Sequence, residues 1–352
     1  MKMKKGKVMS CLESGDVQIF GRVFKVYGFD DDVLYQGVKL NGVYGEFNLS
    51  NLAQLIGPSD VCLDIGANVG MMTLAMAMLA PKGHVYAFEG SPQTTLALTE
   101  TIKANNLDNV SAYSAIIGHS KEKVKFFDAP ESRASGFCVS MDTPRELPRQ
   151  GNLDPNNFQM IISETKSVDD LVAELGLSRV DFIKIDVEGA ELDVLEGARD
   201  TLQRFKPIVV MEFNSYTFTL LRDIPPRRAL KKILATFDDV YYFKNRTGCS
   251  IRIGDTEAER ERFLHENLFC NGFVDDLLCS FRGAELVKRS VINLPKKGIE
   301  GIECELKSES EHRAQLEAAL AQKQREIDLM YASTSWRLTA GLRHLKRIFR
   351  GY

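Results

Sequence analysis

The chain has 352 residues, a formal net charge of -3 and 44% hydrophobic residues, ordinary values for a globular protein with one large or two modest domains. The near-neutral charge disfavours a nucleic-acid-binding protein, and no apolar run reaches the roughly 18 residues of a membrane-spanning helix. The seven cysteines form no CxxC pair, so we expect neither a disulfide framework nor a zinc site, and they fit a reducing compartment. The basic N-terminus lacks the apolar segment of a signal peptide, and we therefore expect a cytoplasmic protein.

Residues 1–50 are expected to form a β-rich extension before the main domain. Residues 17–20 and 23–27 are rich in β-branched and aromatic side chains, and glycine separates the two runs, as is typical of neighbouring strands. A short helix over residues 51–56, ended by a Gly-Pro pair, leads into the next segment.

Residues 51–282 alternate between strand-like and helix-like segments, which predicts a mostly parallel, doubly wound α/β sheet of the Rossmann-like class. The expected strands cover residues 61–64, 85–88, 110–117, 182–186 and 208–211, with helices at 71–79, from Ser91-Pro92 onward and at 191–205. The segment 127–158, rich in Pro, Ser, Asp and Asn, is expected to be irregular. Later segments add a helix at 227–237, weaker strands at 240–243, 251–253 and 277–281, and a helical stretch near 256–275.

The most informative stretch runs from Val61 to Gly70. A short apolar run ends at Asp64, a loop with Gly66 and Gly70 follows, and an apolar helix begins at Met71. This arrangement is typical of nucleotide-type binding sites, and the glycines would let the backbone approach a ligand where a Cβ would collide. The loop lacks the Lys-Ser/Thr pair of a P-loop and the third glycine of a dinucleotide fingerprint. We therefore expect S-adenosylmethionine, which carries no phosphate, with Asp64 accepting from its ammonium group. A tight structural turn is the alternative.

Glu89 strengthens this interpretation. It ends the second expected strand, about 20 residues after the glycine loop, where an acid can accept from both ribose hydroxyls. A solvated carboxylate at a strand end is the alternative. The third expected strand ends beside the position of the adenine. The expected cofactor-binding residues are Asp64, Gly66, Ala67, Asn68, Gly70, Glu89, Ser114, Ala115 and Ile116.

Charged residues gather at the end of the fourth expected strand. Lys184, Asp186 and Glu188 alternate, so their side chains would point the same way if the strand runs through them. A lysine inside a buried strand needs a partner, for which Asp186 or Glu212 would serve. One carboxylate of this group, which includes Glu191, would accept a proton from a substrate hydroxyl; a structural ion-pair network is the alternative. The expected catalytic residues are Lys184, Asp186, Glu188 and Glu212.

The same carboxylates offer oxygen ligands for a divalent cation. No histidine stands beside them in the sequence, so a metal is possible in principle but not favoured.

Together, several segments resemble the FkbM-type class I S-adenosylmethionine-dependent methyltransferases. They are Asp64-Ile-Gly-Ala-Asn-Val-Gly70, Glu89-Gly-Ser-Pro, Ser167-Val-Asp-Asp-Leu and, above all, Asp181-Phe-Ile-Lys-Ile-Asp-Val-Glu-Gly-Ala-Glu191-Leu-Asp-Val-Leu-Glu-Gly-Ala198. The resemblance covers residues 50–215, or 50–282 at its longest. It implies O-methylation, usually of a sugar or polyketide hydroxyl, and a cofactor role for Asp64, Gly66, Asn68, Gly70 and Glu89. It assigns no catalytic base, and Gly90 stands where proline is more usual.

The composition changes again after residue 282. A linker over residues 283–301 leads to a helix over 302–332, whose apolar residues follow a heptad frame interrupted by polar ones, as in a short, imperfect coiled coil. The tail at 333–352 is a basic amphipathic helix with one tryptophan, which suits an anionic membrane surface. Its Ser-Trp-Arg segment resembles tails on surface-glycan enzymes.

These features favour a homo-oligomer formed through the C-terminal helix, and contact with the inner face of a membrane or with glycan-assembly proteins. A single helix packed on its own domain, a docking helix for a partner and a disordered basic end are the alternatives.

The leading hypothesis is an O-methyltransferase that acts on a sugar of a bacterial surface polysaccharide or its lipid-linked precursor. Methylation of a small secondary metabolite or lipid is one alternative. A non-catalytic scaffold in a glycan-assembly complex is the other.

Overall fold

The computed structural model describes residues 11–42, 52–129, 135–142, 158–243 and 250–281. These residues belong to one compact unit, and a second unit begins at Ile292. The linker, coiled coil and basic tail predicted after residue 282 lie outside the described residues. None of the helices in the described part combines the length and apolar composition needed to cross a membrane.

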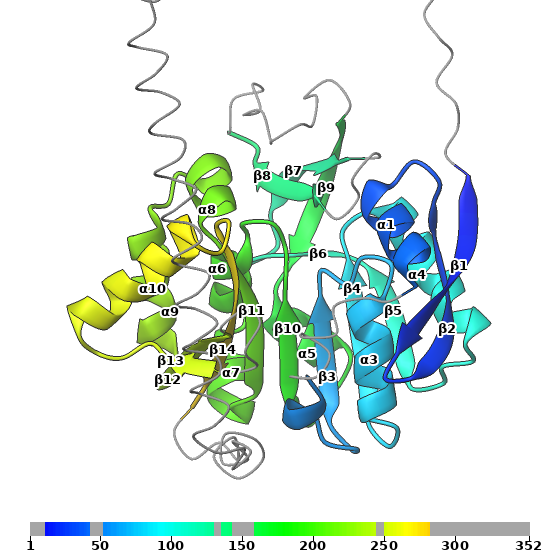
Figure 1. Cartoon of the computed structure of the whole chain (residues 1–352), viewed down its shortest axis with the longest axis horizontal. Coiled ribbons are helices and arrows are strands. Elements are labelled where there is room, and N and C mark those ends of the chain that lie inside the picture. Colours follow the sequence, from blue (N-terminus) through cyan, green and yellow to red (C-terminus); the bar gives the residue numbers. More distant parts are fainter. Residues whose placement is uncertain (1–10, 43–51, 130–134, 143–157, 244–249, 282–352) are drawn as a thin grey trace, which may run out of the picture. The chain divides into compact units, whose positions relative to one another are not determined.

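The core of the unit is a mixed sheet of eight strands (Figure 1). From one edge to the other these are β13 (Ser250–Arg252), β12 (Asp239–Phe243), β14 (Val274–Ser280), β11 (Ile208–Asn214), β10 (Phe182–Ile185), β3 (Val61–Ile65), β4 (His84–Glu89) and β5 (Val110–Ser114). The pairs from β11 to β5 are parallel, whereas the pairs made by β14, β12 and β13 are antiparallel. The predicted mostly parallel α/β class is thus confirmed, and the structure adds the antiparallel edge and the strand order, which the sequence left open.

Helices cover both faces of this sheet (Figure 1). The helices packed in one of its two large hydrophobic clusters are α3 (Met71–Leu79) and α4 (Pro92–Ala104). Those packed in the other are α5 (Val168–Glu174), α6 (Glu191–Glu196), α7 (Arg199–Phe205), α8 (Ser215–Arg222), α9 (Pro226–Thr236) and α10 (Glu257–Phe269). Alternation along the central strands feeds both clusters, because successive side chains of a strand point to opposite faces.

The register of β3 and β10 fixes two charged residues of the site. Phe182 packs in the α3-side cluster, whereas Ile183 and Ile185 pack in the other. Lys184 therefore points toward the α3 side, and it is paired in register with Asp64 of β3.

Local sequence sets the start of α4, but it does not set the end of α6. Ser91 accepts a hydrogen bond from the N–H of Thr94 at the start of α4, as the Ser-Pro pair predicts. The single helix predicted at 191–205 is wrong, because the structure breaks it into α6 and α7 at Gly197. A Cβ at Gly197 would lie 2.2 Å from the carbonyl oxygen of Gly118, so a distant loop occupies the space there.

The N-terminal extension is a hairpin followed by a helix. Strands β1 (Leu12–Ile19) and β2 (Arg22–Phe29) are antiparallel, and α1 (Val33–Asn41), which the sequence analysis did not predict, follows them. The hairpin docks on α4, where the N–H of Tyr27 donates to the hydroxyl of Thr101 at 2.9 Å. This places the extension against the main sheet rather than apart from it.

A second, four-stranded sheet lies beyond one end of the main sheet (Figure 1). Its strands, in order, are β6 (Ile116–Ile117), β9 (Gln159–Lys166), β7 (Lys123–Asp128) and β8 (Phe137–Ser140). The prediction of one strand over 110–117 is therefore wrong, since the chain leaves β5 at Ala115 and enters this sheet. The expectation of an irregular segment over 127–158 is wrong for β8.

Candidate functional site

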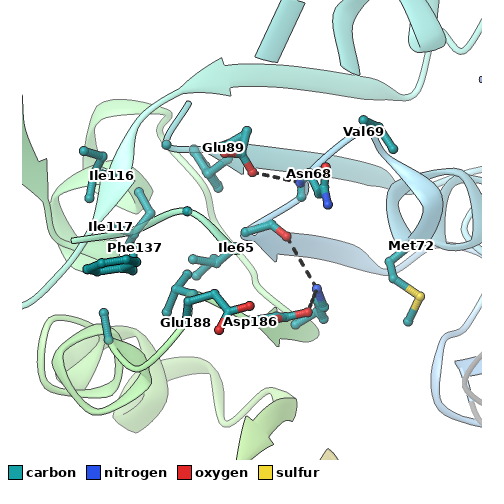
Figure 2. A pocket seen from close by; sticks show the side chains of 18 of the residues that line it. Ile65, Asn68, Val69, Met72, Glu89, Ile116, Ile117, Phe137, Asp186 and Glu188 are labelled. Atoms are coloured by element: carbon teal, nitrogen blue, oxygen red, sulfur yellow. Dashed lines mark hydrogen bonds and ion pairs between the residues drawn. The ribbon is translucent and has the colours of Figure 1, made fainter. Parts of the chain in front are cut away.

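A pocket opens at the carboxyl ends of β3, β4, β10 and β11 (Figure 2), the edge at which open α/β sheets bind ligands. The predicted site residues that line it are Gly66, Ala67, Asn68, Glu89, Ala115, Ile116, Lys184, Asp186, Glu188 and Glu212. The predicted site residues Asp64, Gly70 and Ser114 do not line it. Residues predicted from four separate strand ends therefore meet at one cavity.

Glu89 lies buried at the pocket wall, where backbone N–H groups hold both carboxylate oxygens. Oε2 accepts from Asn68 at 2.9 Å and Oε1 from Ser91 at 2.8 Å. Asn68 has a left-handed φ of 49°, and this turn directs its N–H toward Glu89. Burial raises the pKa of Glu89 to about 7, against the effect of the two N–H donors. Each oxygen keeps a second lone pair for a ligand donor.

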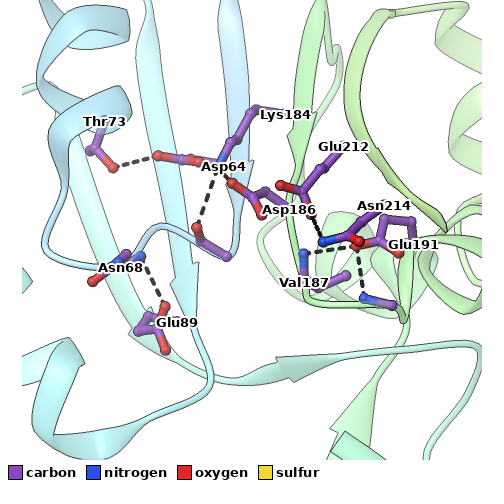
Figure 3. Close-up of polar contacts among 12 residues, drawn as sticks. Asp64, Asn68, Thr73, Glu89, Lys184, Asp186, Val187, Glu191, Glu212 and Asn214 are labelled. Atoms are coloured by element: carbon purple, nitrogen blue, oxygen red, sulfur yellow. Dashed lines mark hydrogen bonds and ion pairs between the residues drawn. The ribbon is translucent and has the colours of Figure 1, made fainter. Parts of the chain in front are cut away.

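Asp64 lies behind the loop rather than in the pocket. Its side chain is fully buried, and its Oδ2 accepts from the hydroxyl of Thr73 at 2.6 Å (Figure 3). Burial raises the pKa of Asp64, while the charge of Lys184 and the Thr73 hydrogen bond oppose that shift. In this structure Asp64 therefore supports the loop through Thr73 and neutralises part of the charge of Lys184.

The glycines of the loop are also required for a reason within the protein itself. A Cβ at Gly66 would lie 1.8 Å from the carbonyl oxygen of Asp186, and one at Gly70 would lie 2.6 Å from Cδ1 of Leu98. Both glycines also have left-handed φ angles, 85° and 97°, which disfavour other residues. These collisions are with protein, so the structure adds a second requirement for these glycines, and their role in letting a ligand approach stays a prediction.

Lys184 forms an ion pair with Asp186 at 2.8 Å, and its Nζ lies 3.5 Å from the carbonyl oxygen of Gly66 (Figure 3). Asp186 is thus the partner, of the two that the sequence offered. The predicted alternation through Glu188 is wrong, because β10 ends at Ile185 and Glu188 has a left-handed φ of 51°. Asp186 and Glu188 reach the pocket from a turn instead of from a strand.

The carboxylates of Glu188 and Glu212, which line the pocket on the side away from Glu89, are close enough to other carboxylates for their pKa values to shift. Burial, followed by the charges of Asp186 and Glu191, raises the pKa of Glu188 to about 8 against the opposing effect of Lys184. Burial raises the pKa of Glu212 well above its ordinary value, and Asp186, Glu188 and Glu191 add to that shift. The side chains of Glu188 and Glu212 therefore hold protons near neutral pH.

Glu191 was only a secondary candidate in the sequence, but its side chain holds the turn that carries Asp186 and Glu188. Its buried Oε1 accepts from the N–H groups of Gly189 at 3.0 Å and Val187 at 3.3 Å. Its Oε2 is buried without a hydrogen-bond partner in the described part of the chain. Burial raises its pKa to about 7.

Two walls of the pocket were not predicted. Leu34, Tyr35 and Val38 of α1 line one side, and Phe126, Phe137 and Cys138 of the small sheet line another. No sequence signal links these segments to the glycine loop, since tertiary packing alone brings them there.

Among the described residues, no group of three or more His, Cys, Asp or Glu side chains is arranged to hold a metal ion.

The sequence match to a family model agrees with this geometry. Residues 64–263, more than half of the chain, match the model described as the methyltransferase FkbM domain. The chain belongs to the FkbM methyltransferase family. Its matched part is therefore an S-adenosylmethionine-dependent methyltransferase domain, and the N-terminal hairpin and α1 lie before the match.

Three curated proteins illustrate the similarity of this FkbM-family chain. The 2-O-methyltransferase NoeI of Sinorhizobium fredii is 29% identical over 53% of this chain and 75% of its own length. The 31-O-demethyl-FK506 methyltransferase FkbM of Streptomyces tacrolimicus is 27% identical over 41% of this chain and 61% of its own length. The hexuronic acid methyltransferase AglP of Haloferax volcanii is 26% identical over 43% of this chain and 55% of its own length. For the last two, the chain spans less than two thirds of the relative.

Among solved structures, the methyltransferase FkbM from Methylobacillus flagellatus KT is similar with a TM-score of 0.38 and 15% identity, over 64% of this chain and 44% of that chain.

Proposed function

We propose that this FkbM-family protein is an S-adenosylmethionine-dependent O-methyltransferase that methylates a sugar hydroxyl of a surface polysaccharide or its lipid-linked precursor. One observation carries the proposal. The pocket has a preset carboxylate, Glu89, on one side and the carboxylates of Asp186, Glu188 and Glu212 on the other. The names of NoeI and AglP, a 2-O-methyltransferase and a hexuronic acid methyltransferase, support oxygen and sugar as acceptors.

The donor half of the pocket fits adenosine better than a phosphate ligand. Glu89 has lone pairs left for two ribose hydroxyls, and a carboxylate repels the phosphate that an arginine would bind. The side chain of Asn68 adds a buried oxygen that has no hydrogen-bond partner among the described residues, which fits a ligand donor. Ile116, Ile117 and Phe137 form an apolar wall against which the adenine ring would pack (Figure 2).

The acceptor half supplies proton acceptors. When bound, S-adenosylmethionine supplies an electrophilic methyl group, and S-adenosylhomocysteine remains once the acceptor oxygen has formed its bond to that carbon. Asp186, Glu188 or Glu212 takes the proton that the hydroxyl loses. A carboxylate whose pKa is raised toward the working pH is a better base than an ordinary one, which favours Glu188 or Glu212. Positioning of the hydroxyl in line with the methyl carbon supplies the remaining acceleration of methyl transfer.

The experiment uses a labelled methyl donor with surface-glycan extracts and with small hydroxylated metabolites, each with and without EDTA. Label in the glycan fraction supports the proposal. Label in small metabolites alone replaces it with the alternative that the name of the FK506 relative favours. Glycan methylation that persists in cells carrying an Asp64→Ala/Glu89→Ala double variant would leave a scaffold role. EDTA sensitivity would introduce a metal.

The proposed attachment of the enzyme rests on its C-terminal sequence. The heptads at 302–332 support a homo-oligomer, and the basic tail at 333–352 supports contact with an anionic membrane surface. Removing residues 302–352 should lower the oligomeric state in sedimentation, and removing 333–352 alone should abolish binding to vesicles of anionic lipid.

A further inference from the structure

The charge of the pocket carries an inference about its acceptor. Of the described residues that line it, the charged ones are Asp32, Glu89, Lys184, Asp186, Glu188 and Glu212. Five are carboxylates, and the one cation, Lys184, is already paired with Asp186 at 2.8 Å. No arginine or histidine in the described ranges lines the pocket.

The acidic character is greatest on the acceptor side, away from Glu89. Glu212 of β11 lies opposite Asp276 in the register with β14, and its neighbour Asn214 donates to it at 3.3 Å. Glu191 lies buried behind the turn that carries Asp186 and Glu188 (Figure 3). The main charges that act on Glu212 are those of other carboxylates, and all of them raise its pKa.

This arrangement acts differently on different acceptors. A sugar hydroxyl donates to carboxylates, so an uncharged ring finds acceptors for its hydroxyl groups on this side of the pocket. A ring that carries a carboxylate or phosphate brings a negative charge into the same buried, acidic surroundings that keep Glu188 and Glu212 protonated near neutral pH, and there repulsion is screened less than in water. Removing an anion from water without a cation to pair with it is unfavourable.

We propose that the acceptor ring of this enzyme is uncharged, and that the pocket discriminates against rings bearing a carboxylate or phosphate. The inference rests on the proposed function and specifies its substrate class. It separates this chain from AglP, whose name gives a hexuronic acid.

The test compares acceptors that differ only at C6, which carries a hydroxymethyl group in one and a carboxylate in the other. We would measure kcat/KM of the full chain for nitrophenyl glucoside and glucuronide, and for nitrophenyl galactoside and galacturonide, with a labelled methyl donor. The glucoside or galactoside should be favoured by ~10-fold or more over its acidic counterpart. Equal or better use of the acidic glycosides overturns the inference and leaves the proposed function standing.

Two variants examine the cause of the preference. Glu212→Gln and Glu188→Gln each replace an ionisable carboxylate with a neutral group of similar shape, so the ratio of acidic to neutral kcat/KM should rise at pH 9, above the pKa of about 8 of Glu188. The ratio cancels any loss of rate shared by both acceptors, which a merely structural defect would cause. Glu164→Gln, on the exposed side of β9 and paired with Lys121, should leave the ratio unchanged. Ratios that stay fixed in both pocket variants overturn the inference.

A binding measurement covers the case in which none of the four glycosides is methylated. The enzyme loaded with S-adenosylhomocysteine is titrated with each glycoside and followed by saturation-transfer NMR. Binding of the neutral glycosides alone supports the inference, and binding of the acidic ones as tightly overturns it. Binding of neither pair removes the sugar acceptor, and with it both the proposed function and this inference.

Discussion

The backbone N–H of Asn68 donates to the carboxylate of Glu89 at 2.9 Å, which ties the loop after β3 to the acid that ends β4. Ser91 holds the other oxygen of Glu89 at 2.8 Å. The carboxylate is therefore oriented before a ligand arrives, and binding needs little ordering of this side chain.

Replacing Glu89 should weaken donor binding. Glu89→Ala removes the acceptor of two ribose hydroxyls and leaves two N–H groups without their partner, which should weaken S-adenosylhomocysteine ~10- to 100-fold, since a hydrogen bond to a charged group contributes ~1.5–3 kcal/mol. Isothermal titration calorimetry measures the change. Glu100→Ala, on the surface of α4 beside Lys103, is the control and should bind normally. An unchanged Kd in Glu89→Ala would remove Glu89 from the site.

Stability should fall as pH rises through neutrality. The pKa of Glu188 is raised to about 8, mainly by burial and then by Asp186 and Glu191, against Lys184. The folded chain therefore holds a proton that the unfolded chain releases near its ordinary pKa of 4.5, and the stability associated with that proton is lost between these values as pH increases. Glu89 and Glu191, with pKa values raised to about 7, act in the same direction. Tm should be lower at pH 8.5 than at pH 6.

Glu188→Gln should flatten this pH dependence, because the amide does not titrate, whereas Glu164→Gln should not. Methyl transfer should show the opposite trend and increase toward pH 8, as the base loses its proton. A Tm that increases with pH in the unmodified chain would contradict the assignment of these raised pKa values.

Gly66→Ala should destabilise the fold severely. The new Cβ would meet the carbonyl oxygen of Asp186 at 1.8 Å, and the φ of 85° is strained for alanine. We expect ~1–2 kcal/mol from the left-handed backbone and ~1–3 kcal/mol from overpacking, measured by urea unfolding. Gly176→Ala is matched in conformation, with φ of 63° and nothing near the added methyl, so it should lose the backbone contribution alone. Equal losses in the two variants would show that the contact with Asp186 is unimportant.

Lys184→Met should also destabilise the chain, because it leaves the carboxylates of Asp64 and Asp186 without their cation. The ion pair is partly buried, with side-chain exposures of 11% for Lys184 and 38% for Asp186, so its loss should cost less than the ~3–5 kcal/mol of a fully buried pair but more than that of an exposed one. The deficit should shrink at pH 5.5 relative to pH 7.5, since burial raises the pKa of Asp64 and this side chain takes up a proton more readily at the lower pH. Lys103→Met breaks an exposed pair with Glu100 and should cost less than ~1 kcal/mol. A pH-independent deficit in Lys184→Met would point to lost packing instead.

Local sequence predicts the parts of the fold whose cause is local. The strand that contains Asp64, the helix cap at Ser91 and the acid at Glu89 depend on short patterns of apolar, capping and turn residues, and the structure has each element in place. The break at Gly197 and the departure of the chain at Ala115 depend on segments far along the chain, which no local pattern reports.

The candidate site shows the same division. Strand ends bring Glu89, Asp186 and Glu212 to one pocket because parallel strands finish at one edge of a sheet. By contrast, the sequence does not show that Gly66 faces the backbone at Asp186, which is remote in the chain. The wall contributed by Tyr35 depends on how the hairpin docks on α4, so it also becomes visible only in three dimensions.

The contact between Gly66 and Asp186 has a consequence for turnover. The N–H of Asp186 also donates to the carbonyl of Ile65 at 2.9 Å, so the floor beneath donor and acceptor is a single rigid piece of backbone. We therefore expect the spent donor to leave past α1 and the small sheet, which line the pocket, rather than between the strands. The rate of product exchange would then follow the motion of these two elements.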